Sequence, residues 1–556
     1  MNRYNYFVYR LLTSNFCLLT SDTPHPPITS NLSPLMYQSL ESKTMGDVDV
    51  VYHNGLYHLF HLVLPNHDFI AHAVSPDGLN WKRIQNAIFI GHPGSWDDHM
   101  LWTMHVTRDP WDKDSWRMFY TGLSSSEEGN VQRVGIARSR DLVHWKKLPS
   151  HWIPEVQGCG DEDAAEAPAM IQGGVDQDSP IPISAQSPHY ESTLEEGRRW
   201  VSFRDPYFVQ EGDTGHLVVA ARVPHGPVIR RGCVAHYVEV AKDTFEPRPP
   251  LHHPGVYDDV EVPNIFKLGK FFYLVGSIRE DAKVRYWYSE SPTGPWKNFY
   301  DNVLLPGGNY AARISFDNDG PMVWNFFAND ETRKKANLMP PPKRIRQAKD
   351  VQLRIEPFEG FNTRVEEVAS AKEVCSIHRM TKDKNASADI DDDGKGMSLQ
   401  STSGFEAFFI DGELESFRLT ADLTLDGDGK CGFLFRFDQE SSSGYHLSLD
   451  LLKGVAQLRR WGVNPGGLTE HAFRFFTIQA SYWRTFENKS CSVILTVMQN
   501  YIEFCIDGKV LLSCADRLYD SGSLGIYVES ACLRVDNIKL ERIIPPSAPT
   551  DNLAAT

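Results

Sequence analysis

A short segment recurs along the first two thirds of the chain. Residues 75–82, Ser-Pro-Asp-Gly-Leu-Asn-Trp-Lys, return at residues 139–146 as Ser-Arg-Asp-Leu-Val-His-Trp-Lys, and residues 289–297 are a looser copy. Each copy follows a short strand-like run, so the repeated unit consists of strand and turn. A supersecondary unit that repeats in this way is typical of a radial or stacked architecture. The repeat therefore predicts the blades of a β-propeller.

Strand pairs in the same part of the chain give the number of blades. Five turns lead into aromatic-rich β runs, over residues 52–60, 116–122, 215–220, 268–275 and 320–326. After residue 353 the repeat is lost, and runs such as 417–423 and 432–437 alternate as half-buried strands do. Many short strands with Gly and Asp turns favour a β-sandwich there.

These patterns predict an all-β chain, a five-bladed β-propeller followed by a C-terminal β-sandwich. We expect an irregular lead-in over residues 1–43, the catalytic propeller over 44–335, a linker over 336–356, the sandwich over 357–545 and a disordered tail over 546–556. Residues 155–197 are rich in Gly, Pro, Ser, Asp and Glu, and we expect them to form a surface insertion between blades.

The charge balance excludes some classes of partner. The 556 residues carry a formal net charge of −16, which would repel nucleic-acid phosphates. No apolar run is long enough to cross a bilayer, so we expect no membrane span. Arg10 and the polar residues 13–15 interrupt the apolar stretch near the N-terminus. Without a clean signal peptide a cytoplasmic location is favoured, with secretion as the alternative.

Three acidic residues stand where a turn meets an apolar strand: Asp47, Asp205 and Glu261. The inner strand of a propeller blade begins near the central axis, so acidic residues at equivalent places in three blades would share one pocket. Hydrolysis of a glycosidic bond needs one carboxylic acid to protonate the leaving oxygen and one carboxylate to attack or to activate water. Crowded carboxylates separate their pKa values, which supplies both forms. Taken alone, each residue fits a turn former or cap better than a catalytic group, but the same placement in three blades predicts a glycosidase.

The motifs around these residues resemble those of glycoside hydrolase family 32, the invertases, inulinases and levanases. Arg204-Asp205-Pro206 matches the Arg-Asp-Pro motif of that family, residues 45–47 resemble its Asn-Asp-Pro-Asn-Gly motif, and residues 260–266 resemble its Glu-Cys motif. The resemblance implies Asp47 as nucleophile, Asp205 as transition-state stabiliser and Glu261 as acid/base. It implies a retaining release of terminal β-fructofuranosyl units from sucrose, inulin or levan, with a carbohydrate as partner and neither cofactor nor metal.

The sequence also departs from the family pattern. Val48 stands where the family has Pro, the Asn-Gly that should follow is missing, and Val262 stands where Cys is usual. Asp49 therefore competes with Asp47 as nucleophile, or else contacts the substrate. Further substrate contacts are predicted for Arg204, which adjoins Asp205, and for Trp96 and Asp98, which lie where family members shape the sugar subsite.

Four alternatives remain open at this stage. One is an inverting enzyme of the related family 43, acting as an arabinofuranosidase or xylosidase. Another is a propeller that binds sugars but has lost catalysis. A third is transfer of a fructosyl unit to a sugar in place of water. The fourth concerns the sandwich, which either packs on the propeller and borders the pocket or binds sugars itself.

Overall fold

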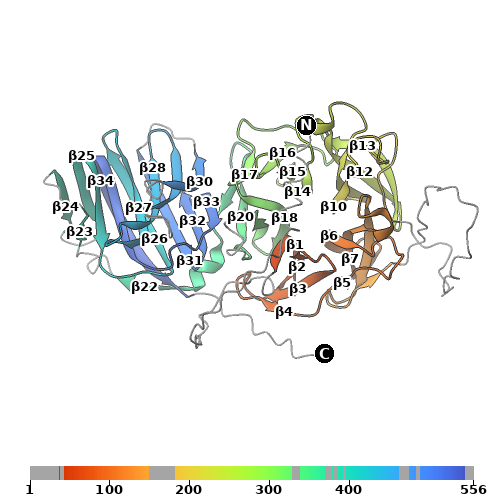
Figure 1. Cartoon of the computed structure of the whole chain (residues 1–556), viewed down its shortest axis with the longest axis horizontal. Helices are drawn as coiled ribbons and strands as arrows, with labels where there is room; N and C mark the ends of the chain where they lie inside the picture. Colours follow the sequence, from red (N-terminus) through yellow and green to blue (C-terminus); the bar gives the residue numbers. More distant parts are fainter. Residues whose placement is uncertain are drawn as a thin grey trace, which may run out of the picture.

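The computed structural model describes residue 37 and residues 43–148, 182–328, 338–369, 377–380, 385–391, 396–462, 475–483 and 489–544. These residues form two bodies of antiparallel strands that lie side by side, the propeller and the sandwich (Figure 1). Helical structure within them is limited to three short 3-10 turns, η1 (Ser125–Glu127), η2 (Val228–Arg230) and η4 (Glu359–Thr363). The predicted fold is thus confirmed.

Some expectations fall on residues outside these ranges. The tail, most of the lead-in and the N-terminal stretch that bears on location lie outside the described residues. In the part of the chain that is described, no helix has the length and apolar character needed to cross a membrane.

Five sheets of consecutive antiparallel strands form the blades. Blade 1 consists of β1 (Thr44–His53), β2 (Leu56–Leu64), β3 (Phe69–Ser75), β4 (Lys82–Arg83) and β5 (Ile88–Phe89), and blade 2 of β6 (Met100–Asp109), β7 (Asp112–Leu123), β8 (Gln132–Ser139) and β9 (Lys146–Lys147). Blade 3 consists of β10 (Phe203–Glu211), β11 (Thr214–Arg222), β12 (Gly232–Ala241) and β13 (Thr244–His252), and blade 4 of β14 (Glu261–Leu268), β15 (Phe271–Ile278), β16 (Lys283–Ser289) and β17 (Val303–Leu305). Blade 5 consists of β18 (Asn309–Asp317), β19 (Gly320–Phe327), β20 (Lys343–Gln347) and β21 (Leu353–Glu356).

The recurring segment joins the third strand of a blade to the next strand. Oδ1 of Asp77 accepts hydrogen bonds from the amides two and three residues further on, at 3.0 and 2.7 Å, and Oδ1 of Asp141 does the same at 2.9 and 2.8 Å. Trp81 closes blade 1 against Trp324 of blade 5, with ring centroids 5.9 Å apart. The repeat therefore serves turn formation and packing between blades.

A second regularity lies in the first strands of the blades, β1, β6, β10, β14 and β18, which contact one another around the central axis. Each contains a break in strand register at the same level, between Met45 and Val48, Leu101 and Met104, Arg204 and Tyr207, Glu261 and Asn264, and Tyr310 and Arg313. A β-bulge of this kind bends the strand and re-aims its side chains. Asp205, Val262 and Ala311 adopt positive φ angles of 62°, 48° and 49° there, which is uncommon for residues other than glycine. The bulges thus reshape the channel end of all five blades.

Two expected segments have a different role in the structure. Residues 343–356, assigned from the sequence to a linker, form β20 and β21 and complete blade 5. The Pro-Pro-Pro run just before them is typical of a linker, and for this reason the two short outer strands were not predicted from the sequence. The end of the expected surface insertion, residues 182–197, is fastened to blade 3, because Tyr190 is fully buried and Glu191 pairs with Arg222 at 2.9 Å.

The sandwich consists of β22 (Val365–Ala369), β23 (Ile377–Arg379), β24 (Ala386–Ile390), β25 (Gly396–Ile410), β26 (Phe417–Asp426), β27 (Lys430–Asp438), β28 (Ser443–Asp450), β29 (Val455–Trp461), β30 (Phe476–Tyr482), β31 (Ser490–Met498), β32 (Tyr501–Ile506), β33 (Lys509–Ala515) and β34 (Ser523–Ile543). The long strand β34 pairs with β25, β26 and β27 and so links the two layers. The sandwich docks on blade 5, where Asn309 Nδ2 donates to the Ser513 carbonyl oxygen at 2.9 Å and Tyr501 stacks on Phe327.

Candidate active site

Asp47, Asp205 and Glu261 meet at the central axis of the propeller. Each lies at the bulge of an inner strand, β1, β10 and β14 respectively. The Thr103 hydroxyl from β6 donates to Asp47 Oδ2 and also hydrogen-bonds Asp205. The backbone amide of Val262, the residue after Glu261, donates to Asp205 Oδ2 at 3.0 Å. The three carboxylates singled out from the sequence are therefore brought into one site.

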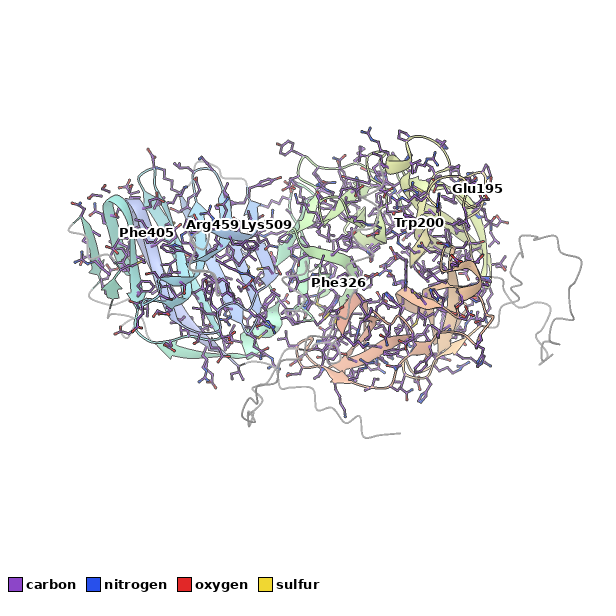
Figure 2. The ribbon with its side chains drawn as sticks, viewed as in Figure 1. Glu195, Trp200, Phe326, Phe405, Arg459 and Lys509 are labelled. Atoms are coloured by element: carbon purple, nitrogen blue, oxygen red, sulfur yellow. The ribbon has the colours of Figure 1, made fainter. Side chains whose placement is uncertain are left out.

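Glu261 is surrounded by groups that favour its charged form. Arg204 Nη2 donates to Glu261 Oε1 at 2.6 Å, Arg279 Nη2 donates to the same oxygen, and the Tyr310 hydroxyl donates to Oε2. Phe326, labelled in Figure 2, packs edge-on against the Tyr310 ring at 6.2 Å between centroids. Burial opposes ionisation, but Arg279 and Arg204 outweigh it and hold the pKa of Glu261 at about 2. Glu261 is therefore a carboxylate in this arrangement.

Asp47 has a contrasting environment. Burial and the neighbouring carboxylate of Asp205 raise the pKa of Asp47 to about 7, against the opposing effects of the Thr103 hydroxyl and Arg313. Burial also raises the pKa of Asp205, although Arg204 partly offsets it. Near neutral pH the proton of the site is thus held on the Asp47 side, while Glu261 is ionised.

Arg204, predicted as a substrate contact, is engaged by several groups of the protein, and its contact with a sugar stays a prediction. It is only 5% exposed, and its donors reach Ser202, Gln132 Oε1 at 3.5 Å and Glu261, with Asp259 Oδ2 at 3.3 Å. Because these acceptors engage both of its terminal nitrogens, Arg204 holds Glu261 in place.

Asp49, the rival of Asp47, is used inside the fold. Its Oδ2 accepts a hydrogen bond from the Val106 amide at 2.6 Å and lies 3.5 Å from His105 Nδ1, while its Oδ1 lies 4.0 Å from Arg313 Nε. The residue is 2% exposed. The geometry therefore places Asp47, and not Asp49, beside Asp205 and Glu261, while Asp49 is held by groups of the protein and its contact with substrate stays a prediction.

Trp96 and Asp98 belong to the packing and loop structure of blade 2. Trp96 is 4% exposed and stacks on Tyr120 with ring centroids 5.7 Å apart. Asp98 accepts hydrogen bonds from the amides of Gly94 and Ser125, both at 2.7 Å, and so ties two loops together. We do not carry either residue into the proposed substrate site, because each side chain is engaged by the protein.

Several residues of the site carry no motif in the sequence. These are Thr103 on β6, Asp259 before β14, Arg279 after β15, and Tyr310 and Arg313 on β18. Burial would raise the pKa of Asp259, but Arg204, Arg279 and Arg198 outweigh it and lower the pKa. Aligning the five inner strands by their bulges would have found Thr103 and Tyr310, which fall at or next to the bulge in blades 2 and 5.

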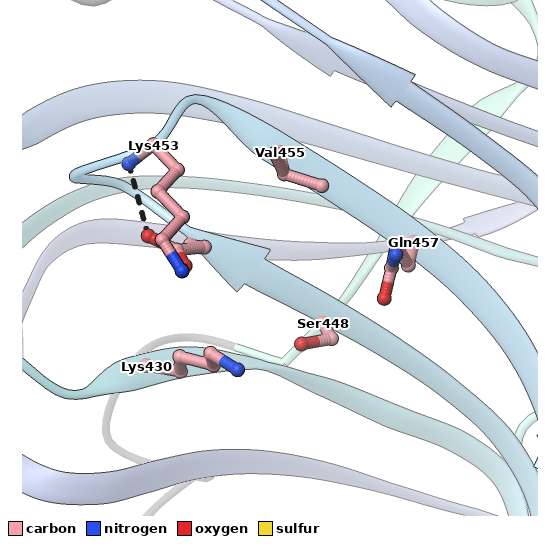
Figure 3. Close-up of a pocket in the computed structure, with 6 residues that line it drawn as sticks. Lys430, Ser448, Lys453, Val455 and Gln457 are labelled. Atoms are coloured by element: carbon pink, nitrogen blue, oxygen red, sulfur yellow. Dashed lines mark hydrogen bonds and ion pairs between the residues drawn. The ribbon is translucent and has the colours of Figure 1, made fainter.

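Two further observations limit where the chemistry lies. Among the described residues, no group of three or more His, Cys, Asp or Glu side chains is arranged to hold a metal ion. A shallow groove of about 230 Å³ lies on the sandwich, lined by Lys430, Ser448, Asp450, Lys453, Val455 and Gln457 (Figure 3). This groove is in the other domain from the three carboxylates, so we do not assign the chemistry to it.

The comparisons with known proteins agree with this geometry. The model of the glycosyl hydrolases family 32 N-terminal domain matches residues 41–157, which hold blades 1 and 2 and Asp47. This part of the chain is thus similar to glycoside hydrolase family 32. No curated protein matches its sequence.

Several solved structures match this chain in fold over nearly its whole length. The β-fructofuranosidase of Bombyx mori is 15% identical, with a TM-score of 0.58 over 92% of this chain and 94% of that one. The exo-inulinase of Aspergillus awamori is 14% identical, with a TM-score of 0.62 over 92% and 98%. The fructan 1-exohydrolase IIa of Cichorium intybus is 14% identical, with a TM-score of 0.62 over 92% and 97%. The predicted enzyme class, a glycosidase, is that of the family.

Proposed function

We propose that this protein is a retaining glycosidase of family 32 that cleaves terminal β-fructofuranosyl linkages of the sucrose, inulin or levan type. The observation that carries the proposal is the convergence of Asp47, Asp205 and Glu261 at three bulges around one axis. Structures of the Bombyx mori and Cichorium intybus enzymes in complex with sucrose and 1-kestose support a carbohydrate as the substrate.

In the first step, the Asp47 carboxylate attacks the anomeric carbon and forms an ester bond to the sugar. The bond from that carbon to the leaving oxygen breaks, and Glu261 gives its proton to this oxygen. Asp205 stabilises the positive charge that develops on the sugar ring. In the second step, Glu261 takes a proton from water, the water oxygen bonds to the anomeric carbon, and the ester bond to Asp47 breaks.

This sequence needs the proton on Glu261 and the charge on Asp47, the reverse of the free protein. The two carboxyl groups hold one proton between them at neutral pH, so the reaction requires its transfer from the Asp47 side to Glu261. Arg279 is the exposed member of the Glu261 cluster, with 37% of its side chain accessible. A substrate that displaces Arg279 removes one of the two cations that lower the pKa of Glu261.

The test is a proton NMR time course of the purified protein with sucrose, inulin and levan, and with an arabinofuranosyl glycoside in parallel. We expect fructose to be released with retained configuration. The Asp47→Asn variant should lose this activity, while Asp141→Asn, which changes a turn aspartate outside the site, should keep it.

Other outcomes favour the alternatives. Cleavage of the arabinoside alone, with inversion, would move the protein to a family-43-like activity. Formation of longer fructosyl oligosaccharides would indicate transfer to sugar. Sugar binding without any turnover would leave a propeller that binds and does not cut. Undiminished turnover by Asp47→Asn would contradict the proposed nucleophile.

A further inference from the structure

A buried cation, Arg313, lies among the first strands of the blades. Arg313 is the first residue after the bulge of β18, and it is 0% exposed. A fully buried guanidinium is costly unless its donors are satisfied and its charge is matched. The partners of Arg313 therefore show what it is for.

These partners come from all of the other four blades. Arg313 Nη2 donates to the carbonyl oxygens of Met104 in blade 2, at 3.1 Å, and Pro206 in blade 3, at 2.8 Å. Its Nη1 donates to the carbonyl oxygen of Pro263 in blade 4 at 3.2 Å, and its Nε faces Asp49 Oδ1 of blade 1 at 4.0 Å. Since Arg313 itself belongs to blade 5, one side chain hydrogen-bonds the inner strands of three other blades and faces a carboxylate of the fourth.

Each of these anchor points is close in sequence to a residue of the site. Pro206 follows Asp205, Pro263 stands two residues after Glu261, Met104 follows Thr103, and Asp49 stands two residues after Asp47. A guanidinium presents its donors in a rigid planar fork. The separation of the three bulges, and with it the spacing of the carboxylates, is thus set by one rigid group.

The same group supplies positive charge to the site. The charged and titratable groups that face it are Asp47 and Asp49 from β1, His105 from β6 through Asp49, and Asp205 and Tyr207 from β10, with the Tyr207 ring 5.6 Å from its guanidinium carbon. Asp47 is faced in turn by Asp205, Glu261, Thr103 and Arg313, and Arg313 is the cation that opposes the rise in the pKa of Asp47.

We propose that Arg313 is a positioning residue for the reaction, which fixes the mutual placement of the three carboxylates and favours the charged, attacking form of Asp47. This inference rests on the proposed function for its turnover measurements. It is distinct from the two-arginine cluster at Glu261, because Arg313 donates to backbone carbonyl groups and not to Glu261.

The experiment compares Arg313→Lys and Arg313→Met with Arg117→Met as a matched control. Arg117 is also fully buried, but it pairs with Glu239 away from the axis, at 2.6 Å. For each protein, kcat, KM and the pH dependence of kcat/KM are measured on sucrose or inulin. The melting temperature is also measured from pH 5 to 9 with and without Asp47→Asn, which reports the charge of Asp47 without turnover.

We expect Arg313→Met to lower kcat by about 100-fold, the effect of a misplacement of about 1 Å, with KM changed much less. Its high-pH loss of activity should move upward by about one pH unit, because the opposing cation is gone. Arg313→Lys should keep the wild-type pH dependence but lose kcat, since it retains the charge and lacks the fork. Arg117→Met should lower the melting temperature without moving the pH dependence.

Each other outcome is decisive. Unchanged kcat in Arg313→Lys would overturn the positioning role, and this variant decides alone if Arg313→Met does not fold. An unmoved pH dependence in a folded Arg313→Met would overturn the charge role. If no fructoside is turned over by the wild type, the proposed function fails, and the shift in the Asp47-dependent melting difference still tests Arg313.

Discussion

Asp47 and Glu261 belong to one pocket and are both buried, yet the two sides of this pocket are built differently. Glu261 has two guanidinium groups and a tyrosine hydroxyl within hydrogen-bond distance. Asp47 has a threonine hydroxyl and a neighbouring carboxylate, and the cation that opposes the rise in its pKa is Arg313. The pKa is held at about 2 on one side and raised to about 7 on the other. Burial acts on both groups in the same direction, so the difference comes from the neighbouring groups, which belong to other blades except for Arg279.

The largest expected effects come from neutralising each carboxylate in turn. Glu261→Gln and Asp47→Asn should each lower kcat strongly, by about 10²–10⁴ for the acid/base. Their stabilities should differ, because Glu261→Gln leaves buried arginine charge unmatched whereas Asp47→Asn removes a poorly compensated carboxyl group. Thermal melting should show a drop for the first and no drop for the second. Equal changes in melting temperature for the two variants would contradict the different environments of Glu261 and Asp47.

Removal of Arg204 should disrupt the Glu261 side. Arg204→Met leaves Asp259 and Glu261 without their buried partner, and breaking such a pair costs about 3–5 kcal/mol. Denaturant unfolding of the propeller measures this loss. The control is Arg248→Met, whose partner Glu246 is at the surface, 3.0 Å away, and which should cost about 1 kcal/mol or less. A similar cost for both variants would mean that the site does not depend on its buried cation.

The wild-type pH dependence reports the Asp47 side. The pair needs one proton, and that proton resides in the free protein on a group with a pKa of about 7. As pH rises through this value the proton is lost, so kcat/KM should fall about tenfold per pH unit above it. Initial rates between pH 5 and 9 provide the measurement. If kcat/KM stayed constant up to pH 9, the proton given to the leaving oxygen would not come from Asp47 and Glu261.

Thr103→Val should sharpen that result. The variant removes the hydroxyl that donates to the charged form of Asp47, an interaction of about 1.5–3 kcal/mol for an ionised acceptor. The pKa of Asp47 should rise by about one to two units, which carries the high-pH loss of activity upward. Thr121→Val is the control, since Thr121 accepts from the Asp205 amide at 3.1 Å and touches no carboxylate oxygen. A shift in the control as large as in Thr103→Val would point to distortion of the bulge.

The smallest shift is expected from Arg279→Gln. Its side chain is 37% exposed, and exposed ion pairs contribute about 0–1 kcal/mol, equivalent to less than about one pKa unit. The pKa of Glu261 should therefore rise modestly, with a small upward shift of the pH–rate profile. Arg285→Gln, which removes the partner of Asp281 beyond the site, should leave the profile in place. A shift larger than that of Thr103→Val would reverse the order of influence argued here.

The blades and the three carboxylates could be predicted from the sequence, because turns and short motifs depend only on residues that are close together in the chain. The Asn54-Gly55 turn has positive φ at both residues, 50° and 79°, as a tight hairpin requires, and such turns mark strand pairs without any tertiary information. Asp47, Asp205 and Glu261 stand in recognisable motifs. Their roles remain predictions, since chemistry and not position decides them.

The remaining features depend on contacts between distant blades. Thr103, Arg279, Tyr310 and Arg313 come from three blades and share no motif. Their part in the site follows only from the way the ring closes. Residues 343–356 were misassigned for a related reason, because short outer strands are defined by the strand they pair with more than by their own pattern.

The repeated bulge gives the fold a separation between scaffold and reactive groups. Each blade contributes a break in the register of its first strand, and in three blades a carboxylate at this break interacts with the other two. Exchanging a residue there alters the reactive set while the hydrogen-bonded ladders on both sides of the kink are unchanged. The five kinks act as interchangeable positions, so a lineage can explore new activities at its core with little loss of foldability.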